Sequence, residues 1–191
     1  MISKKIKARI FLITILLLFS APFIASWYLV FYSDFKQGDD GVENGILISP
    51  VIELGEVEAN VIGLNKKETV YGKWTISAFV GQSCDESCED LLYKLRQLRL
   101  AIGKNLDKVD RLIFSDSDEI MKYSENYTGQ KVVYEKTELS RIKLVFNSVP
   151  SFDKNNIFLI DPYGFIMMTY KRDAEPKGII RDIERLIKNS K

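Results

Sequence analysis

The chain has 191 residues, of which 27 are basic and 26 acidic, so its formal net charge is only +1. No block of basic residues lies outside the N-terminal flank, and we therefore expect no nucleic-acid partner. Histidine is absent from the sequence. Its absence excludes a catalytic imidazole base, the common zinc sites and a Ser-His-Asp triad.

The N-terminal segment has the pattern of a membrane anchor. Residues 1–9 carry four basic side chains, and residues 10–32 carry no charge. An uncharged run of this length can cross a hydrocarbon core of ~30 Å as a helix. Acidic residues follow the run, so the positive-inside rule predicts a cytoplasmic N-terminus and a single span of the inner (plasma) membrane. A cleaved signal peptide is the alternative, but its apolar core is shorter, and Phe23-Ile24-Ala25 is a poor cleavage site.

Two regions are expected beyond the span. Residues 33–55 begin with a stretch rich in Gly and Asp and are interpreted as a linker. Residues 56–191 are long enough for one domain of ordinary size. The predicted orientation places this domain in the periplasm or an equivalent extracytoplasmic space.

Strands and helices alternate along the soluble domain. Residues 73–80 form a short apolar run with β-branched and aromatic side chains, which is typical of a central strand buried on both faces. Residues 89–104 repeat leucine and isoleucine at helical spacing. The remaining expected elements are a strand at 109–115, a short helix at 117–126, a strand at 132–134, a helix at 138–146, strands at 156–160 and 165–170 joined by an Asp-Pro-Tyr-Gly turn, and a helix at 177–189.

This order of elements is that of the thioredoxin fold with an insertion before its final hairpin. We therefore predict an α/β domain with a thioredoxin-like fold, in which helices flank a central mixed sheet, preceded by one transmembrane helix. Reactive cysteines of that fold stand where the first central strand turns into a helix. The only two cysteines of the chain, Cys84 and Cys88, fall at this junction.

Three interpretations of the cysteine pair are open. A permanent disulfide staple is disfavoured because closing a five-residue loop stabilises a fold by only ~2 kcal/mol, against ~4.7 kcal/mol for a hundred-residue loop. Two unrelated free thiols are the second interpretation. The third is a reversible dithiol on one face of a helix, with Cys84 as the exposed nucleophile and Cys88, one turn deeper, as the resolving residue. The helix dipole favours the Cys84 thiolate, and the neighbouring acidic side chains oppose it.

The segment GKWTISAFVGQSCDESCEDL resembles the strand, loop and helix of the Sco/SenC copper chaperones, and SFDKNNIFLIDPYGFIMMTY is similar to their hairpin. The resemblance implies a role in cytochrome oxidase assembly, with Cys84 and Cys88 as ligands of Cu(I) and the copper subunit of a terminal oxidase, or another thiol protein, as partner. The third copper ligand of that family is a histidine, and its place falls here near Asp153. A hard carboxylate is a poor ligand for soft Cu(I), so any copper is expected to be held transiently by two thiolates.

The missing histidine keeps a second function open, that of a general thiol-disulfide oxidoreductase, for instance in cytochrome c maturation. A binding module with a vestigial site is a third alternative, which the intact cysteine pair argues against. Three further positions carry an expectation. One of Met167 and Met168 should fill the core, Trp74 is interpreted as a core residue, and Pro150 is either a cis-proline facing the cysteines or an ordinary loop proline.

Overall fold

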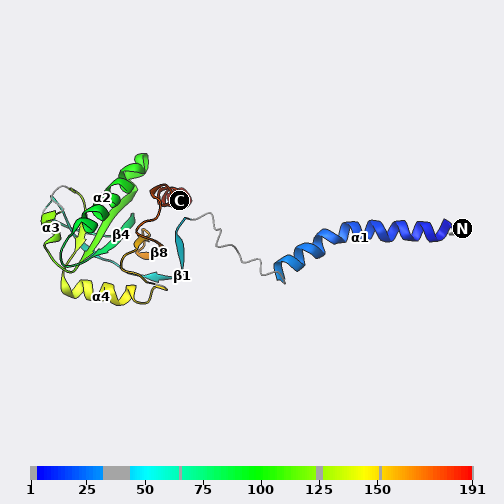
Figure 1. Cartoon of the computed structure of the whole chain (residues 1–191), viewed down its shortest axis with the longest axis horizontal. Helices are drawn as coiled ribbons and strands as arrows, with labels where there is room; N and C mark the ends of the chain where they lie inside the picture. The colour runs from blue at the N-terminus through cyan, green and yellow to red at the C-terminus, as the bar shows by residue number, and fades with distance from the viewer. Residues whose placement is uncertain (1–3, 32–43, 65, 124–126, 151, 191) are drawn as a thin grey trace. The chain divides into compact units, whose positions relative to one another are not determined.

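The computed structural model describes residues 4–31, 44–64, 66–123, 127–150 and 152–190. The chain divides into two compact units, residues 1–42 and 43–191. The first contains the helix α1 (Lys4–Phe31), and the second contains the remaining described elements (Figure 1).

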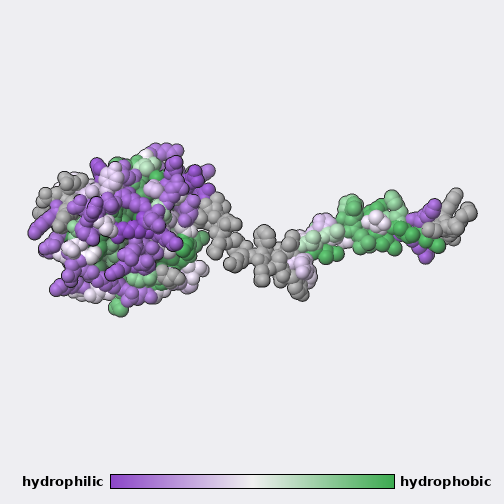
Figure 2. Space-filling view, in the orientation of Figure 1, coloured by the Kyte–Doolittle hydropathy of each residue, from purple (hydrophilic) through white to green (hydrophobic). Residues whose placement is uncertain are grey.

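Helix α1 provides one candidate membrane span, Arg9–Tyr28, with a mean hydropathy of 2.2. Its described side chains are almost all exposed, and Figure 2 shows an apolar surface along its middle. The hydroxyl groups of Thr14 and Ser20 donate to the carbonyl oxygens of Ile10 and Leu16, at 2.9 and 2.8 Å. These two hydroxyl groups are thereby satisfied inside the helix, as a hydrocarbon environment requires. The expected helical run is confirmed up to Phe31; Tyr32 lies outside the described residues.

The second unit is built on one mixed sheet, which has eight strands within the described residues, in the order β1-β8-β7-β4-β5-β6-β2-β3. The strands are β1 (Ile46–Glu53), β2 (Glu58–Val61), β3 (Lys66–Thr69), β4 (Trp74–Val80), β5 (Val109–Ser115), β6 (Lys131–Val133), β7 (Ile157–Ile160) and β8 (Phe165–Tyr170). The helices are α2 (Glu86–Ala101), the 3-10 helix η1 (Gly103–Lys108), α3 (Ile120–Tyr123), α4 (Lys136–Phe146) and α5 (Pro176–Asn189).

Two hydrophobic cores cover the two faces of the sheet. Leucines of α2 and isoleucines of α5 pack on one face, and Leu139, Ile142 and Phe146 of α4 pack on the other. Figure 1 shows α2 and α4 on opposite sides of the strands. Strand β5 supplies both cores in alternation, because successive side chains of a strand point to opposite faces: Ile113 joins the first core, and Leu112 and Phe114 join the second.

The centre of the sheet sets where the site can lie. Strands β4 and β5 run parallel and in register from Trp74 opposite Val109 to Val80 opposite Ser115. Their carboxyl ends therefore meet at one edge of the sheet, and the loop that carries Cys84 and leads to Cys88 in the first turn of α2 starts there. In open α/β sheets this edge is the usual position for ligand sites.

The expected mixed sheet flanked by helices is confirmed, and β4, β5, β8 and α5 match their expected positions within a residue. The turn after β7 has the predicted form, since the Gly164 amide donates to the Asp161 carbonyl at 3.1 Å. Trp74 is a core residue, and Met168 is the buried member of the methionine pair. Residues 124–126, at the end of the expected helix 117–126, lie outside the described residues.

The differences lie mainly before the first central strand. Strand β1 lies within residues 33–55, where we expected only a linker, and pairs antiparallel with β8. The hairpin of β2 and β3 was not predicted either; it extends the sheet beyond β6. The cis-proline interpretation of Pro150 is wrong: among the described residues the cis peptide bond precedes Pro50, in β1.

Glu135 joins the hairpin to the start of α4. Its carboxylate accepts a hydrogen bond from Asn60 Nδ2 at 2.9 Å and pairs with Lys67 Nζ at 2.9 Å. Partial burial raises the pKa of Glu135, but the bonds from Lys67 and Asn60 outweigh it and hold this pKa at about 2. Because the folded-state pKa lies below the usual 4.5, the ionised carboxylate contributes stability above that pH, and the contribution is lost as pH falls through about 2.

Glu135→Gln is therefore expected to make the thermal stability of the chain depend less on pH in the acid range. The wild-type chain should lose more thermal stability than the variant between about pH 5 and pH 2, because only the wild type must take up a proton on this group to unfold. Thermal unfolding of the full chain in detergent at a series of pH values measures the difference. Glu184→Gln, an exposed change on α5, is the control and should leave this pH dependence unchanged. Parallel curves for wild type and E135Q would contradict the assignment.

Candidate functional site

The cysteine motif spans the junction of β4 and α2. After Val80 the chain runs through an exposed loop, and α2 begins at Glu86 because Asp85 caps it. The Asp85 carboxylate accepts a hydrogen bond from the Cys88 amide at 3.0 Å, and the Asp85 carbonyl accepts one from the Glu89 amide at 3.0 Å. An aspartate at this position satisfies an amide that the helix leaves unpaired. The helix thus starts three residues earlier than its apolar repeat indicated.

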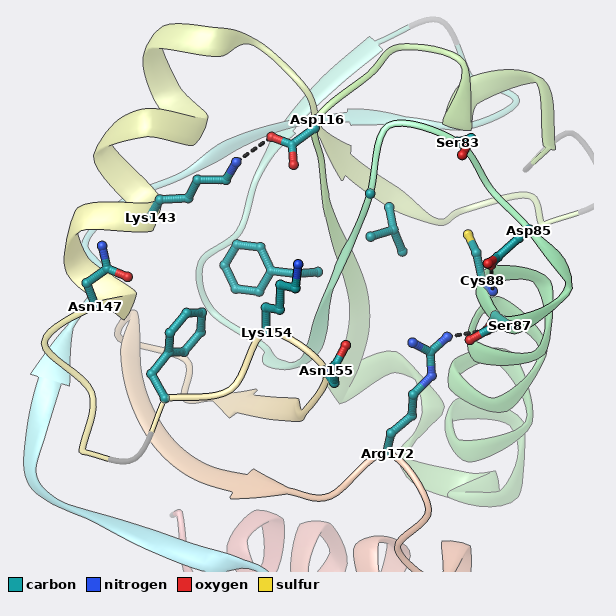
Figure 3. A pocket seen from close by; sticks show the side chains of 14 residues that line it. Ser83, Asp85, Ser87, Cys88, Asp116, Lys143, Asn147, Lys154, Asn155 and Arg172 are labelled. Carbon is teal, nitrogen blue, oxygen red and sulfur yellow. Dashed lines mark hydrogen bonds and ion pairs between the residues drawn. The ribbon is translucent and has the colours of Figure 1, made fainter.

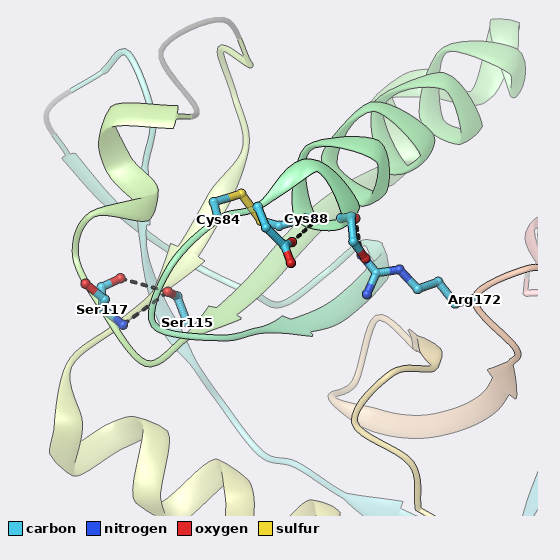
Figure 4. The surroundings of a disulfide bond; sticks show 7 residues. Cys84, Cys88, Ser115, Ser117 and Arg172 are labelled. Atoms are coloured by element: carbon cyan, nitrogen blue, oxygen red, sulfur yellow. Dashed lines mark hydrogen bonds between the residues drawn. A yellow bond between two sulfur atoms is a disulfide. The ribbon is translucent and has the colours of Figure 1, made fainter.

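Cys84 and Cys88 form a disulfide, with their Cα atoms 5.0 Å apart (Figure 4). The expectation that both cysteines lie one turn apart on the helix is wrong. Cys84 precedes the cap residue, and only Cys88 lies in the first turn. The bond therefore joins the loop to the helix, and α2 keeps regular geometry from its first residue onward.

The disulfide lies at the border between core and surface. Cys84 is 9% exposed and Cys88 is 5% exposed. Cys88 begins the buried stripe of α2, which continues through Leu91, Leu92, Leu95 and Leu98. The same residue also lines a surface pocket with a volume of about 500 Å³. The disulfide is thus packed against the core on one side and borders an opening through Cys88 on the other. Cys84, which we expected to be the exposed member of the pair, is also buried and does not line this pocket.

The pocket is assembled from segments that are distant in sequence (Figure 3). Phe79 and Val80 enter it from the end of β4, and Asp85, Ser87 and Cys88 from the start of α2. The opposite walls come from β5, α4, the loop before β7 and the segment after β8; their residues are Asp116, Lys143, Asn147, Phe152, Lys154, Asn155 and Arg172.

The charges around the pocket are unevenly compensated. Lys143 forms an ion pair with Asp116, and the Asp85 carboxylate is engaged as the helix cap. Arg172 donates to the carbonyl oxygen of Ser87, which carries no formal charge. Lys154 is exposed, and within the described part of the chain it has no ion-pair or hydrogen-bond partner.

Arg172 and Lys94 fasten the disulfide-bearing turn to the segment after β8. Arg172 donates to the first turn of α2 at Ser87, while Lys94, two turns further along, donates to the carbonyls of Arg172 and Ala174 at 2.5 and 2.8 Å. Partial burial lowers the pKa of Lys94, an effect that Asp173 opposes. The segment after β8 thus donates to α2 through Arg172, and α2 donates to the segment through Lys94. Both side chains therefore help to hold the cysteine turn in place.

The pocket does not supply a third ligand for copper. Among the described residues, no group of three cysteine, histidine, aspartate or glutamate side chains is placed to hold a metal ion. Asp153 lines a neighbouring pocket, and its carboxylate accepts a hydrogen bond from the Asn155 amide at 2.9 Å. Met168 lies in the core, where its sulfur accepts from the Tyr170 hydroxyl. From the loop before β7, Phe152, Lys154 and Asn155 line the disulfide pocket, and the Lys154 ammonium repels a cation.

Sequence reasoning identified the cysteines but missed the opposite walls. Phe152, Lys154 and Arg172 lie roughly sixty to ninety residues after the motif, and no local pattern marks them as site residues. Gln82, two residues before Cys84 in the sequence, is exposed and does not line the pocket. Lys154 directly follows Asp153, where the family resemblance had placed the missing ligand, and this adjacency was the one available signal.

A family model described as "Transmembrane-like, thioredoxin-like, C-terminal domain" matches residues 74–190, which is well over half of the chain. Its matched region begins at β4 and includes both cysteines and every wall of the pocket. No curated protein is similar enough in sequence to count as a relative.

Solved structures with the same fold include several Sco proteins. ScoI of Bradyrhizobium japonicum, solved with copper bound, is 20% identical, with a TM-score of 0.55, and the match covers 70% of this chain and 98% of that one. A SCO1/SenC family lipoprotein from Bacillus anthracis is 18% identical, with a TM-score of 0.58 and coverage of 73% and 99%. BsSco, described as a member of the Sco family of cytochrome c oxidase assembly proteins with a disulfide switch, is 16% identical, with a TM-score of 0.55 and coverage of 73% and 96%. The predicted thioredoxin-like fold and its likeness to Sco proteins are therefore confirmed at the level of structure.

Replacing the cap residue should weaken the site's scaffold. Asp85→Ala leaves the Cys88 amide without its acceptor and is expected to reduce the unfolding free energy by about 1 kcal/mol, while Asp85→Asn, which can still cap, should lose much less. Asp90→Ala removes the same charge from an exposed position of α2 and serves as the control. Thermal unfolding of the oxidised full chain compares the three variants. Equal losses for D85A and D90A would mean that charge, and not capping, is responsible.

Proposed function

The chain belongs to the transmembrane-like, thioredoxin-like family, and from this premise we propose that it is a membrane-anchored, Sco-type factor that exchanges disulfides with a partner protein. The observation that carries the proposal is the Cys84–Cys88 disulfide at the carboxyl edge of the central strands, bordering an open pocket. A bond that closes so short a loop adds little stability, so its position beside an opening supports reversible chemistry.

The proposed reaction passes two electrons to a disulfide of the partner. In the reduced protein the Cys84 thiolate attacks one partner sulfur; a Cys84–partner bond forms, the partner's own bond breaks, and the released partner thiolate takes up a proton. The Cys88 thiolate then attacks the Cys84 sulfur, which restores the Cys84–Cys88 bond and releases the second partner thiol. A dithiol protein of the same compartment returns the pair to its reduced form by the reverse exchange.

The copper-binding subunit of a terminal oxidase is the proposed partner, since its metal can load only when its own cysteines are reduced. The likeness to Sco proteins supports this choice. The pocket favours a redox role over metal delivery, because it offers two sulfur atoms, no third ligand among the described residues and a lysine on the opposite wall.

Anchoring by α1 would keep the soluble domain beside a membrane partner. The basic residues before Ile10 and the acidic residues after Tyr32 favour an N-terminus in the cytoplasm and a thioredoxin-like domain in the extracytoplasmic space. Such a compartment is oxidising, which makes a dedicated reductant useful.

A general thiol-disulfide oxidoreductase, for instance one that serves cytochrome c maturation, is the second candidate. The missing third ligand favours it, because a pure redox role needs only the cysteine pair. The two candidates share the exchange chemistry and differ in the partner that is reduced.

Trapping identifies the attacking sulfur. With Cys88→Ser the second attack is blocked, so a mixed disulfide through Cys84 should accumulate with the partner and migrate as a larger, reductant-sensitive band in gels. Cys84→Ser is the matched variant and should trap little. If the adduct accumulates only in C84S, the two roles are reversed, and if neither variant forms an adduct with any disulfide substrate, the proposed function is wrong.

Copper titration separates redox from metal handling. The reduced full chain is expected to hold Cu(I) weakly in competition with a chelator, since two thiolates are its only soft ligands at the pocket. Lys154→His places an imidazole on the pocket wall and should tighten retention about tenfold, the change that ~1.4 kcal/mol produces. Asp153→His, in the neighbouring pocket, is the control and should not tighten it. A wild-type affinity unchanged by K154H would mean that a third ligand already exists.

A further inference from the structure

The pocket beside the disulfide has the size of a binding site for a few side chains. Its volume of about 500 Å³ lies within the range of small-ligand sites. Cys88 lies on one wall and Lys154 and Asn155 on another, as Figure 3 shows. Because Cys88 borders the pocket, a protein segment that approaches the disulfide from this side places its neighbouring side chains in or along it.

The inner end of the pocket is aromatic and firmly packed. Phe79 contacts Phe114 at 4.8 Å and Phe146 at 4.9 Å between ring centroids, and Phe152 lies 5.7 Å from both Phe79 and Phe158. Phe79 and Phe152 are only partly buried and line the pocket. Because these rings are held by the core beneath them, they offer a preformed apolar surface to an aromatic or branched side chain.

Some charges of the pocket are paired within the protein, and others are left without an ionic partner among the described residues. The Lys143–Asp116 pair is neutral as a unit, and the cysteine wall carries the acidic Asp85. Lys154 and Arg172 add two positive charges that form no ion pair with a carboxylate of the described residues: Lys154 extends from the loop before β7, and the Arg172 guanidinium lies at the Ser87 carbonyl, beside the cysteine turn. Asp153, next in sequence to Lys154, lines the neighbouring pocket and bonds to the Asn155 amide. A carboxylate entering the pocket would therefore be attracted to Lys154, whose charge has no partner, and to Arg172, while Asp85 opposes its approach close to the cap of α2.

We propose that this pocket recognises an acidic, apolar segment of the redox partner, in which an aromatic or branched side chain and a carboxylate flank the reacting cysteine. The apolar side chain packs on Phe79 and Phe152, and the carboxylate pairs with Lys154. The proposal rests on the proposed disulfide exchange and adds the chemistry that selects the partner. The whole chain has a net charge of only +1, so a preference for acidic segments has to come from local charge.

Charge-matched peptides test the proposal. Three peptides, Glu-Phe-Cys-Phe-Glu, Gln-Phe-Cys-Phe-Gln and Lys-Phe-Cys-Phe-Lys, carry their cysteine as a 2-thiopyridyl disulfide. The reduced full chain, in discs of zwitterionic phosphatidylcholine, attacks the peptide disulfide and releases 2-thiopyridone, whose absorbance gives the second-order rate constant. We expect the acidic peptide to react at least about threefold faster than the basic one, with the neutral peptide between them, and the gap to close near ~1 M salt.

Two variants assign the preference to the pocket. Lys154→Glu should abolish or invert the faster reaction of the acidic peptide. Lys177→Glu makes the same charge change on the exposed surface of α5, away from the pocket, and should leave it intact. The small neutral probe 2,2′-dithiodipyridine measures the intrinsic thiol reactivity of each protein, and each peptide rate is divided by the rate with this probe. K177E should react with the probe as the wild type does.

The outcomes separate recognition from exchange. Equal rates for the three peptides with a normal rate for the neutral probe would overturn the recognition proposal and leave disulfide exchange standing. Recognition by the pocket is also ruled out if K154E keeps the acidic preference, or if K177E loses it as K154E does. No reaction with any probe would instead remove the proposed function itself.

Discussion

The arrangement of the site depends on where α2 begins. Asp85 caps the helix by accepting from the Cys88 amide, and the leucine stripe of α2 is buried on the sheet. Together these two constraints determine the rotation and the starting point of the helix, so that Cys88 is both a first-turn residue and the first member of the buried stripe. Cys84 then lies in the preceding loop within bonding distance. A helix that began at Glu89, after the motif, would leave both sulfur atoms on an exposed loop.

The second constraint comes from the opposite wall of the pocket. Near Asp153, where the sequence resemblance would place a copper-binding histidine, this chain presents Lys154 and Asn155 to the disulfide pocket, while Asp153 lines a neighbouring pocket. An ammonium group opposes cation binding but favours an anionic partner. Under the proposed function, this ammonium group would favour the selection of a protein thiol over the holding of a metal within a shared fold.

The strands and helices at the centre of the fold were predictable because their signal is local. Strand β4 is buried on both faces and is therefore continuously apolar, and α2 and α5 repeat leucine or isoleucine at helical spacing. The outer strands were not predictable. The exposed residues of β3 are mostly charged, and β1 contains a proline and a register shift, so neither has a clear alternating pattern. Their conformation is imposed by pairing with β2 and β8, and the residues of β8 that face β1 lie more than a hundred positions later in the chain.

By itself, the sequence determined the apolar N-terminal helix, the order of the central elements and the pair of cysteines, because each depends on composition or spacing within a few turns of chain. Only the tertiary structure decided that the cysteines are joined across the cap of α2, that the sheet continues through β1 and the β2–β3 hairpin, and that Phe152, Lys154 and Arg172 face the disulfide. The pocket arises when segments roughly sixty to ninety residues apart in the chain pack at one edge of the sheet, and β1 pairs with a strand more than a hundred residues later. No local pattern encodes a wall whose partners are brought together only by folding.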